Sequence, residues 1–407
     1  MGQFLKFATD IEREKRMKLL LAALFTVSSI TLAQAGGTDQ FFDNASGTPL
    51  LSLLANAKTS IDIEIYEMDD PLFIQTIDKA ISKGVRVRVV KEERPVGASC
   101  RVFTAKANTD SASCAAQKVL VKTIDNAGGV YLPFKKDTLC GVSSACYEHG
   151  KIVLVDGKQA LISTGNFNSS NLCNKNEHPN NCNRDYSVVS RDTSVVATLE
   201  QIFESDVRGV LYDVSALLMH SNNQKLTVSP FSLAPLVALI KSAKTKVQIQ
   251  NQYLKDPDLN QAIVEVAKSG VQVEVMVASV CAFGKPRPNE IAKWQKTYGE
   301  FDQAGVKTRI FTRNIKVGGV AGYLHAKAIV IDGNRAWVGS VNGSTTSLAD
   351  NREYGIFVND LTETKKLKSF MDSDFANSMG ESWQDSVQCK HDPAPAPQGT
   401  LPQSSDG

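Results

Sequence analysis

Two stretches of the chain carry the residues best suited to chemistry, and both have the same pattern. Residues 149–156 and residues 325–332 each read His-x-Lys-x-x-x-x-Asp, and Gly follows directly. A histidine titrates at about pH 6.5, so it can act as a general acid or base near neutrality, whereas lysine keeps its positive charge. Side chains alternate along a β-strand, which places the His and Lys of each stretch on one face. Each stretch therefore predicts a proton-transfer group beside a cation.

Further polar residues follow each stretch in the same order. An Asn stands ten positions after each Asp, at Asn166 and Asn342. Later, residues 183–186 read Asn-Arg-Asp-Tyr and residues 351–354 read Asn-Arg-Glu-Tyr. The chain therefore carries two complete sets of the same polar residues.

This arrangement resembles the phospholipase D superfamily, whose signature is the His-Lys-Asp motif. The resemblance covers nearly all of the chain after residue 35. It implies that one histidine attacks phosphorus to form a phosphohistidine, while the other protonates the leaving alcohol and then activates water. The lysines and the two asparagines would stabilise the phosphate oxygens. The implied catalytic set is His149, Lys151, Asp156, His325, Lys327 and Asp332, with Asn166 and Asn342 as phosphate-binding residues.

The resemblance also distributes roles within this set. Asp185 and Glu353 would orient the two imidazoles, and Asp156 and Asp332 would hold the strand and its turn rather than react. The commoner assignment in the family makes His149 the nucleophile and His325 the acid. No metal or other cofactor is expected. One loop departs from its counterpart, since residues 163–165 read Ser-Thr-Gly where residues 339–341 read Gly-Ser-Val.

The elements that would position these residues also occur twice. Pro49 and Gly84 return as Pro235 and Gly270 at one offset, whereas the motifs have a smaller offset. The first copy therefore contains an insert before its motif, between Cys100 and Cys114, which we expect to be a surface loop.

Each copy alternates strands and helices. The spacing predicts strands at 60–66 and 85–90, with a helix at 71–83 between them, and matching elements at 246–250, 257–269 and 271–277. Such alternation favours an α/β fold with mostly parallel sheets. We expect two duplicated α/β/α units related by a pseudo-two-fold axis, with one active site at their interface. The apolar segments 129–134 and 317–323, just before the motifs, fit an acyl-chain entrance or plain strand packing equally well.

The first 35 residues indicate export. Residues 1–35 are typical of a signal peptide, with Met17 as an alternative true start and a membrane anchor as the rival interpretation. We expect a first half at 36–222, a second half at 223–388 and a disordered tail at 389–407, in a secreted or periplasmic protein. Removing residues 1–35 leaves 40 basic and 40 acidic side chains, so no global field would attract nucleic acid.

Eight cysteines lie beyond the leader, and an even number in an exported chain predicts disulfides. Sequence alone leaves their connectivity open. Proximity along the chain favours three pairs and leaves a fourth as the remainder: Cys100–Cys114, Cys140–Cys146, Cys173–Cys182 and Cys281–Cys389.

The resemblance implies a monomeric phospholipase D that hydrolyses phospholipids at a membrane surface to phosphatidic acid and a free head group. Transfer of the phosphatidyl group to another alcohol would use the same intermediate. The alternative is a secreted, metal-independent endonuclease, but that branch typically has one motif per chain. The lack of an apolar span after the leader argues against a membrane-embedded cardiolipin synthase. A binding protein without activity is disfavoured because both sets are intact.

Overall fold

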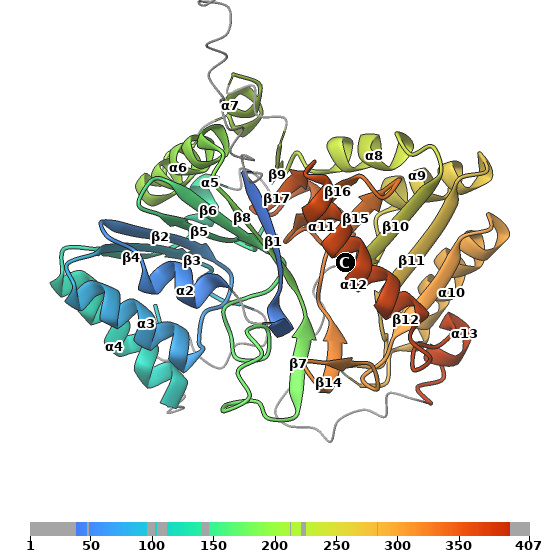
Figure 1. Cartoon of the computed structure of the whole chain (residues 1–407), viewed down its shortest axis with the longest axis horizontal. Helices are drawn as coiled ribbons and strands as arrows, with labels where there is room; N and C mark the ends of the chain where they lie inside the picture. The colour runs from blue at the N-terminus through green and yellow to red at the C-terminus, as the bar shows by residue number, and fades with distance from the viewer. Residues whose placement is uncertain are drawn as a thin grey trace, which may run out of the picture. The chain divides into compact units, whose positions relative to one another are not determined.

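The computed structural model describes residues 38–46, 49–95, 102–103, 112–139, 146–211, 213–220, 225–282 and 284–390. From Asp39 onward the described residues form one compact unit that contains both copies (Figure 1). The expected signal peptide, most of the tail and the proposed boundary at 222 lie outside the described residues.

The first copy builds a seven-stranded sheet in the order β1-β8-β6-β5-β2-β3-β4. Its elements in chain order are β1 (Asp39–Asp43), η1 (Asn44–Ser46), α2 (Pro49–Ala55), β2 (Ser60–Ile65), α3 (Pro71–Ser82), β3 (Arg86–Lys91), α4 (Ala112–Asn126), β4 (Val130–Pro133), α5 (Lys136–Leu139), β5 (Lys151–Val155), β6 (Gln159–Ser163), β7 (Asn181–Arg184), β8 (Tyr186–Ser190), α6 (Thr193–Arg208) and α7 (Val214–His220).

The second copy repeats this sheet in the order β12-β11-β10-β15-β16-β17-β9. Its elements are β9 (Leu226–Ser229), α8 (Leu233–Lys241), β10 (Lys246–Asn251), α9 (Pro257–Lys268), β11 (Gln272–Ala278), α10 (Pro288–Gln303), β12 (Lys307–Phe311), β13 (Lys316–Val317), β14 (Val320–Leu324), β15 (Ala328–Ile331), β16 (Arg335–Gly339), α11 (Thr345–Ala349), β17 (Glu353–Val358), α12 (Leu361–Ala376) and α13 (Trp383–Ser386). No described helix is both long and apolar enough to span a membrane.

The α/β class and the duplication are confirmed, and the strand pairings refine the sheets. Parallel pairing joins β2 to β3 and β3 to β4, and likewise β10, β11 and β12. The other pairs within both large sheets are antiparallel. The expected parallel arrangement therefore holds for three strands of each sheet, and the sheets are mixed. The Asp-Gly turn after each motif accounts for one antiparallel pair in each sheet, β5 with β6 and β15 with β16, since a tight turn joins antiparallel neighbours.

Asp156 and Asp332 build these two turns. Both have positive φ values, 56° and 52°, and the glycines that follow them have φ values of 62° and 70°. Two successive positive φ angles define a type I′ hairpin turn, which favours Asp-Gly. Each carboxylate also accepts hydrogen bonds from three successive backbone amides at the start of the neighbouring strand, residues 58–60 or residues 244–246. The motif aspartates therefore join the hairpin to the next strand.

Side chains alternate between the two faces of each motif strand, so one face packs in a core shared by both halves and the other packs in a core of its own half. Ile152 and Leu154 of β5 join Ala328 and Val330 of β15 in a single buried cluster, which also takes side chains from α6 and α12. The residues between them on each strand face separate clusters, packed under α2, α3 and α4 in one half and under α8, α9 and α10 in the other. Figure 1 shows these two groups of helices beside their own sheets. The halves thus share one hydrophobic core.

A small third sheet and the disulfides connect further segments. Strand β7 of the first half pairs in parallel with β14 of the second half, and β14 also pairs with β13. The predicted disulfides Cys173–Cys182 and Cys281–Cys389 are confirmed. The second of these anchors the first residue of the expected tail. Cys114 and Cys146 are also disulfide-bonded, and their predicted partners, Cys100 and Cys140, lie outside the described residues.

Candidate active site

Each motif histidine is hydrogen bonded to a carboxylate from the other half. His149 Nδ1 lies 2.9 Å from Glu353 Oε2, and His325 Nδ1 lies 2.9 Å from Asp185 Oδ1. We call these contacts the crossed pairs. They bring the two motifs together at the boundary between the halves, as expected for a single shared site.

Backbone pairing between the halves produces this crossing. The amide of His149 donates to the carbonyl of Arg352 at 2.9 Å, and the amide of His325 donates to the carbonyl of Arg184 at 3.1 Å. Each arginine directly precedes the acidic residue of its half. The strand that carries a carboxylate therefore lies beside the motif of the other copy, which fixes which acid meets which imidazole.

The carboxylates fix the protonation pattern of the rings. Burial opposes ionisation, but the neighbouring His325 and His149 lower the pKa values of Asp185 and Glu353 respectively. An ionised carboxylate only accepts hydrogen bonds, so each Nδ1 donates and each Nε2 is left to react. Burial lowers the pKa of His149 and lowers that of His325 to about 4.

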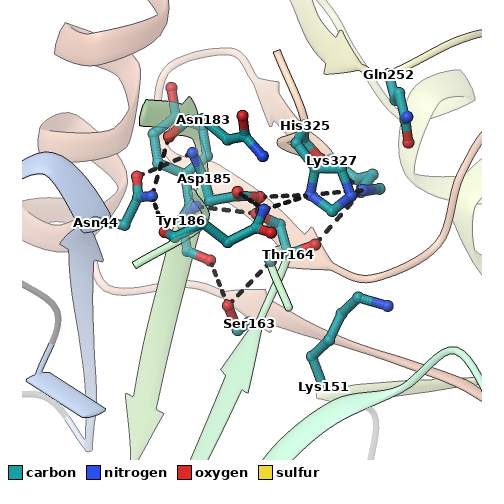
Figure 2. A network of polar contacts seen from close by, with 12 residues as sticks. Asn44, Lys151, Ser163, Thr164, Asn183, Asp185, Tyr186, Gln252, His325 and Lys327 are labelled. Carbon is teal, nitrogen blue, oxygen red and sulfur yellow. Dashed lines mark hydrogen bonds and ion pairs between the residues drawn. The ribbon is translucent and has the colours of Figure 1, made fainter. Parts of the chain in front are cut away.

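Two fully buried lysines lie beside the histidines, and Figure 2 shows Lys327 next to His325. Lys151 Nζ donates to the carbonyl of His149 at 2.5 Å, and Lys327 Nζ lies 3.3 Å from both ring nitrogens of His325. Burial lowers the pKa of Lys151 to about 7 and that of Lys327 to about 8. Two cations that lose protons so readily mark a site built to receive an anion.

Asn166 and Asn342 follow strands β6 and β16 and are almost completely buried. The Oδ1 atom of each is buried without a hydrogen bond partner in the structure. A phosphate oxygen accepts hydrogen bonds, so only the Nδ2 group of each amide could donate to it. The phosphate-binding role of these two side chains stays a prediction.

The loop at residues 163–165 differs in sequence from its counterpart at residues 339–341, and the difference follows from the shorter acidic residue, Asp185, in this half. A Cβ on Gly165 would lie 2.6 Å from the Asp185 carboxyl carbon, so only glycine allows this approach. Thr164 Oγ1 donates to Asp185 Oδ1 at 2.6 Å (Figure 2). The loop thus closes around an aspartate where the second half has a longer glutamate.

Three asparagines that the sequence did not single out for a role hold the carboxylates. Asn171 Nδ2 donates to Asp185 Oδ2 at 2.5 Å, and Asn351 Nδ2 donates to Glu353 Oε1 at 2.9 Å. Asn44 accepts from the Asp185 amide at 3.0 Å (Figure 2). Asn351 lies inside the repeated Asn-Arg-acid-Tyr segment, which was its only signal, while Asn44 is 141 residues from its partner.

The motif aspartates lie in the two hairpin turns, where the resemblance implied that they hold the strand and its turn rather than react. Asp156 lies after the last residue of β5, whereas His149 lies before the first. A strand rises about 3.3 Å per residue, so the two ends of β5 are well separated. The apolar segments 129–134 and 317–323 contain β4 and most of β14, and the choice between an acyl-chain entrance and strand packing stays open.

Comparison with known proteins agrees with this geometry. A family model described as "Cardiolipin synthase, PLD-like domain" matches residues 50–207 and 236–375. The chain belongs to the phospholipase D superfamily.

Curated members of this superfamily align along most of the chain. A cardiolipin synthase of Listeria monocytogenes serotype 4a is 22% identical over 396 residues, covering 89% of this chain and 74% of the relative. The major cardiolipin synthase ClsA of Bacillus subtilis is 24% identical over 393 residues, covering 90% and 73%. Both relatives are named cardiolipin synthases, and the expectation against a membrane-embedded form of such an enzyme stays a prediction.

A solved structure shares the fold. The phosphatidylserine synthase of Haemophilus influenzae Rd KW20 superposes with a TM-score of 0.58 at 13% identity, covering 84% of this chain and 87% of that one. At this identity the likeness concerns the fold alone.

Proposed function

We propose that this phospholipase D superfamily protein is a phosphodiesterase that acts on phospholipids through a phosphohistidine intermediate. The observation that carries the proposal is the pair of crossed contacts, which gives both imidazoles the same tautomer and leaves both Nε2 atoms reactive. Two buried lysines, and the Nδ2 groups of the buried Asn166 and Asn342, would donate hydrogen bonds to a phosphate. The names of the relatives support a phospholipid as substrate.

In the first step, His149 Nε2 attacks phosphorus and the bond from phosphorus to the head-group oxygen breaks. His325, protonated, gives its proton to that oxygen. In the empty site burial lowers the pKa of His325 to about 4, but an entering phosphate anion favours the imidazolium. Lys151 and Lys327 offset the charge that develops on the phosphate oxygens.

In the second step, His325 takes a proton from an acceptor hydroxyl as the oxygen of that acceptor attacks phosphorus and the P–N bond breaks. Water as acceptor gives phosphatidic acid, which is the hydrolysis expected from the sequence. An alcohol as acceptor gives a new phosphodiester, and the names of the cardiolipin synthase relatives favour this branch as well.

The experiment uses vesicles that contain phosphatidylglycerol and phosphatidylcholine, with and without added glycerol, beside a parallel incubation with plasmid DNA. We expect released head group and phosphatidic acid, plus an exchanged phospholipid when glycerol is present. His149→Ala and His325→Ala should each lower turnover at least about a thousandfold. The control is His178→Ala, an exposed side chain in the loop before β7.

Plasmid nicking without head-group release would instead favour the endonuclease alternative. Quenching during turnover and mapping the phosphorylated peptide identifies the nucleophile, and a label on His325 would reverse the assigned roles.

We also propose that the protein is exported and acts as a monomer. The disulfides among its described residues support an oxidising compartment.

A further inference from the structure

A buried network of carboxyl groups lies behind His149. Glu64 of β2, Glu148 and Asp206 of α6 are 0%, 0% and 2% exposed. The Glu64 carboxyl group interacts with those of Glu148 and Asp206, and Glu64 Oε1 and Glu148 Oε2 are buried without another hydrogen bond partner. Arg352 Nε lies 3.0 Å from Asp206 Oδ2, and Tyr354 Oη donates to Glu64 Oε2 at 2.8 Å. Three carboxyl groups thus surround one guanidinium.

This arrangement requires a bound proton. Two carboxylates cannot hydrogen bond to each other, because an ionised carboxylate only accepts. Burial raises the pKa values of Glu64 and Asp206 well above their usual range and raises that of Glu148 to about 8. The charged or titratable groups that face the Glu64–Glu148 pair or its neighbours are Asp206, Arg352, Tyr354, Lys151, Glu92 and, through Glu92, Lys136.

The other half has a corresponding buried network that needs no bound proton. Gln250 takes the place of Glu64, and Leu324 takes the place of Glu148. Tyr186 Oη donates to Gln250 Oε1 at 2.7 Å, and Gln250 Nε2 donates to Asp374 Oδ2 at 3.0 Å. An amide N–H therefore does here what an acidic proton does behind His149. Only the His149 half contains a hydrogen bond between two carboxyl groups at this place.

The network contacts the backbone on both sides of His149. Glu148 precedes it, and Glu148 Oε1 accepts from the amide of Gly150 at 2.6 Å. A Cβ on Gly150 would lie 2.6 Å from both Glu148 Oε1 and the Tyr354 ring, whereas the matched residue in the other half is Ala326. Arg352 and Tyr354 of the network flank Glu353, the partner of His149. Both members of one crossed pair are thus held by the same buried network.

We propose that the proton shared by Glu64 and Glu148 positions His149 against Glu353, so that losing this proton misaligns His149 and leaves His325 in place. Glu64 and Glu148 are positioning residues that act through His149. The activity readout rests on the proposed function, so a second readout observes His149 without substrate.

The variants are chosen from the matched half and from isosteres. Glu64→Gln and Glu148→Gln keep a hydrogen-bonding group that does not titrate, and Glu148→Leu installs the residue of the other half and removes the acceptor for the Gly150 amide. The control is Glu265→Gln, an exposed side chain on α9.

Turnover on vesicles is measured from pH 6 to pH 10. We expect kcat of the natural protein to change little as Glu148 loses its own proton at about pH 8, and to fall at higher pH, when Glu64 loses the proton that the pair then shares. Glu64→Gln and Glu148→Gln should move this alkaline limb upward by at least about one pH unit. Glu148→Leu should lower kcat about tenfold to a hundredfold at every pH with little change in KM, and Glu148→Gln should restore most of the loss. Coincident alkaline limbs, or a Glu148→Leu variant equal to the control, would overturn the proposal.

The second readout is the downfield Nδ1–H proton resonance of each crossed histidine, assigned by comparison with His149→Ala and His325→Ala. In the free natural protein, the His149 resonance should persist through about pH 8 and disappear at higher pH, when Glu64 loses the shared proton, while the His325 resonance persists. In Glu64→Gln the His149 resonance should persist to higher pH. Equal pH dependence of the His149 resonance in both proteins would refute the positioning role. An inactive natural protein that shows the expected resonances would refute the proposed function alone.

Discussion

At the scale of single residues, the buried lysines make binding depend on pH. Lys151 and Lys327 have pKa values of about 7 and about 8 because burial disfavours their charged forms. The unfolded lysine has a pKa of about 10.4, so the unfolded chain still binds these protons between the two values. The empty protein should therefore gain stability as pH rises above about 7, while its attraction for anions declines.

Dimethyl phosphate is a phosphodiester that stays singly charged. We expect its inhibition constant to rise above pH 7 by up to about tenfold per pH unit, because binding weakens. Competition against vesicle substrate from pH 6 to pH 9 measures it. Lys151→Arg, which keeps its charge, should flatten the dependence between pH 7 and pH 8. Inhibition that does not change with pH would show that the lysines remain charged in the empty site.

The sequence identified both histidines, both lysines and both orienting acids at this scale. It did not predict the crossing, because each acid follows the motif of its own half along the chain, and nothing in the sequence pairs it with the motif of the other half. Backbone pairing of Arg352 and Arg184 with the opposite motif decides the matter, and that pairing is tertiary. Asn44 and Asn171 were missed for the same reason, since their contacts with Asp185 involve no repeated pattern.

At the scale of elements, the Asp-Gly hairpins fix the position of the motif strands. Although burial opposes it, hydrogen bonds from the backbone amides of Lys246, Thr245 and Lys244 lower the pKa of Asp332 to about 2. A lowered pKa means that this stabilisation is complete above the unfolded value of about 3.9 and is lost as pH falls toward about 2.

Asp332→Asn should lower the free energy of unfolding by about 2 kcal/mol at pH 7 and should weaken the acid dependence between about pH 4 and pH 2. Asparagine tolerates the positive φ at this position, so the change isolates the charge. Urea unfolding measures the effect, with the exposed Asp125→Asn on α4 as control. A full loss of turnover in the folded variant at pH 7 would give this aspartate a catalytic role.

Local patterns predicted some elements closely and others not at all. The helix expected at 71–83 is α3 (Pro71–Ser82), where Asp70 accepts from the Phe73 amide and Pro71 occupies the first turn. Strand β7 (Asn181–Arg184) reads Asn-Cys-Asn-Arg and has no apolar alternation. Its partner β14 belongs to the other half, so tertiary pairing rather than local preference makes it a strand.

At the scale of the whole molecule, the two halves share a core and several buried polar contacts. One buried cluster takes residues from both sheets. Arg184 of the first half pairs with Asp43 and with Asp374 of the second half, at 2.7 and 2.9 Å. Removing either half would expose the apolar core face and leave buried charges without partners.

We therefore expect the halves to unfold together. All three tryptophans, Trp294, Trp337 and Trp383, belong to the second half, so their fluorescence reports that half, while far-ultraviolet circular dichroism reports the whole chain. In urea the two signals should give one midpoint. A tryptophan transition that is displaced from the dichroism transition would show that each half folds independently.

The crossed pairs also make the two reactive rings vulnerable at a distance. Each imidazole is hydrogen bonded to a carboxylate of the opposite half. A small separation of the two halves would therefore break both hydrogen bonds at once. A compound or antibody that binds between the halves and separates them would inhibit the protein without contacting its histidines. A resistant variant would have to restore two hydrogen bonds rather than one.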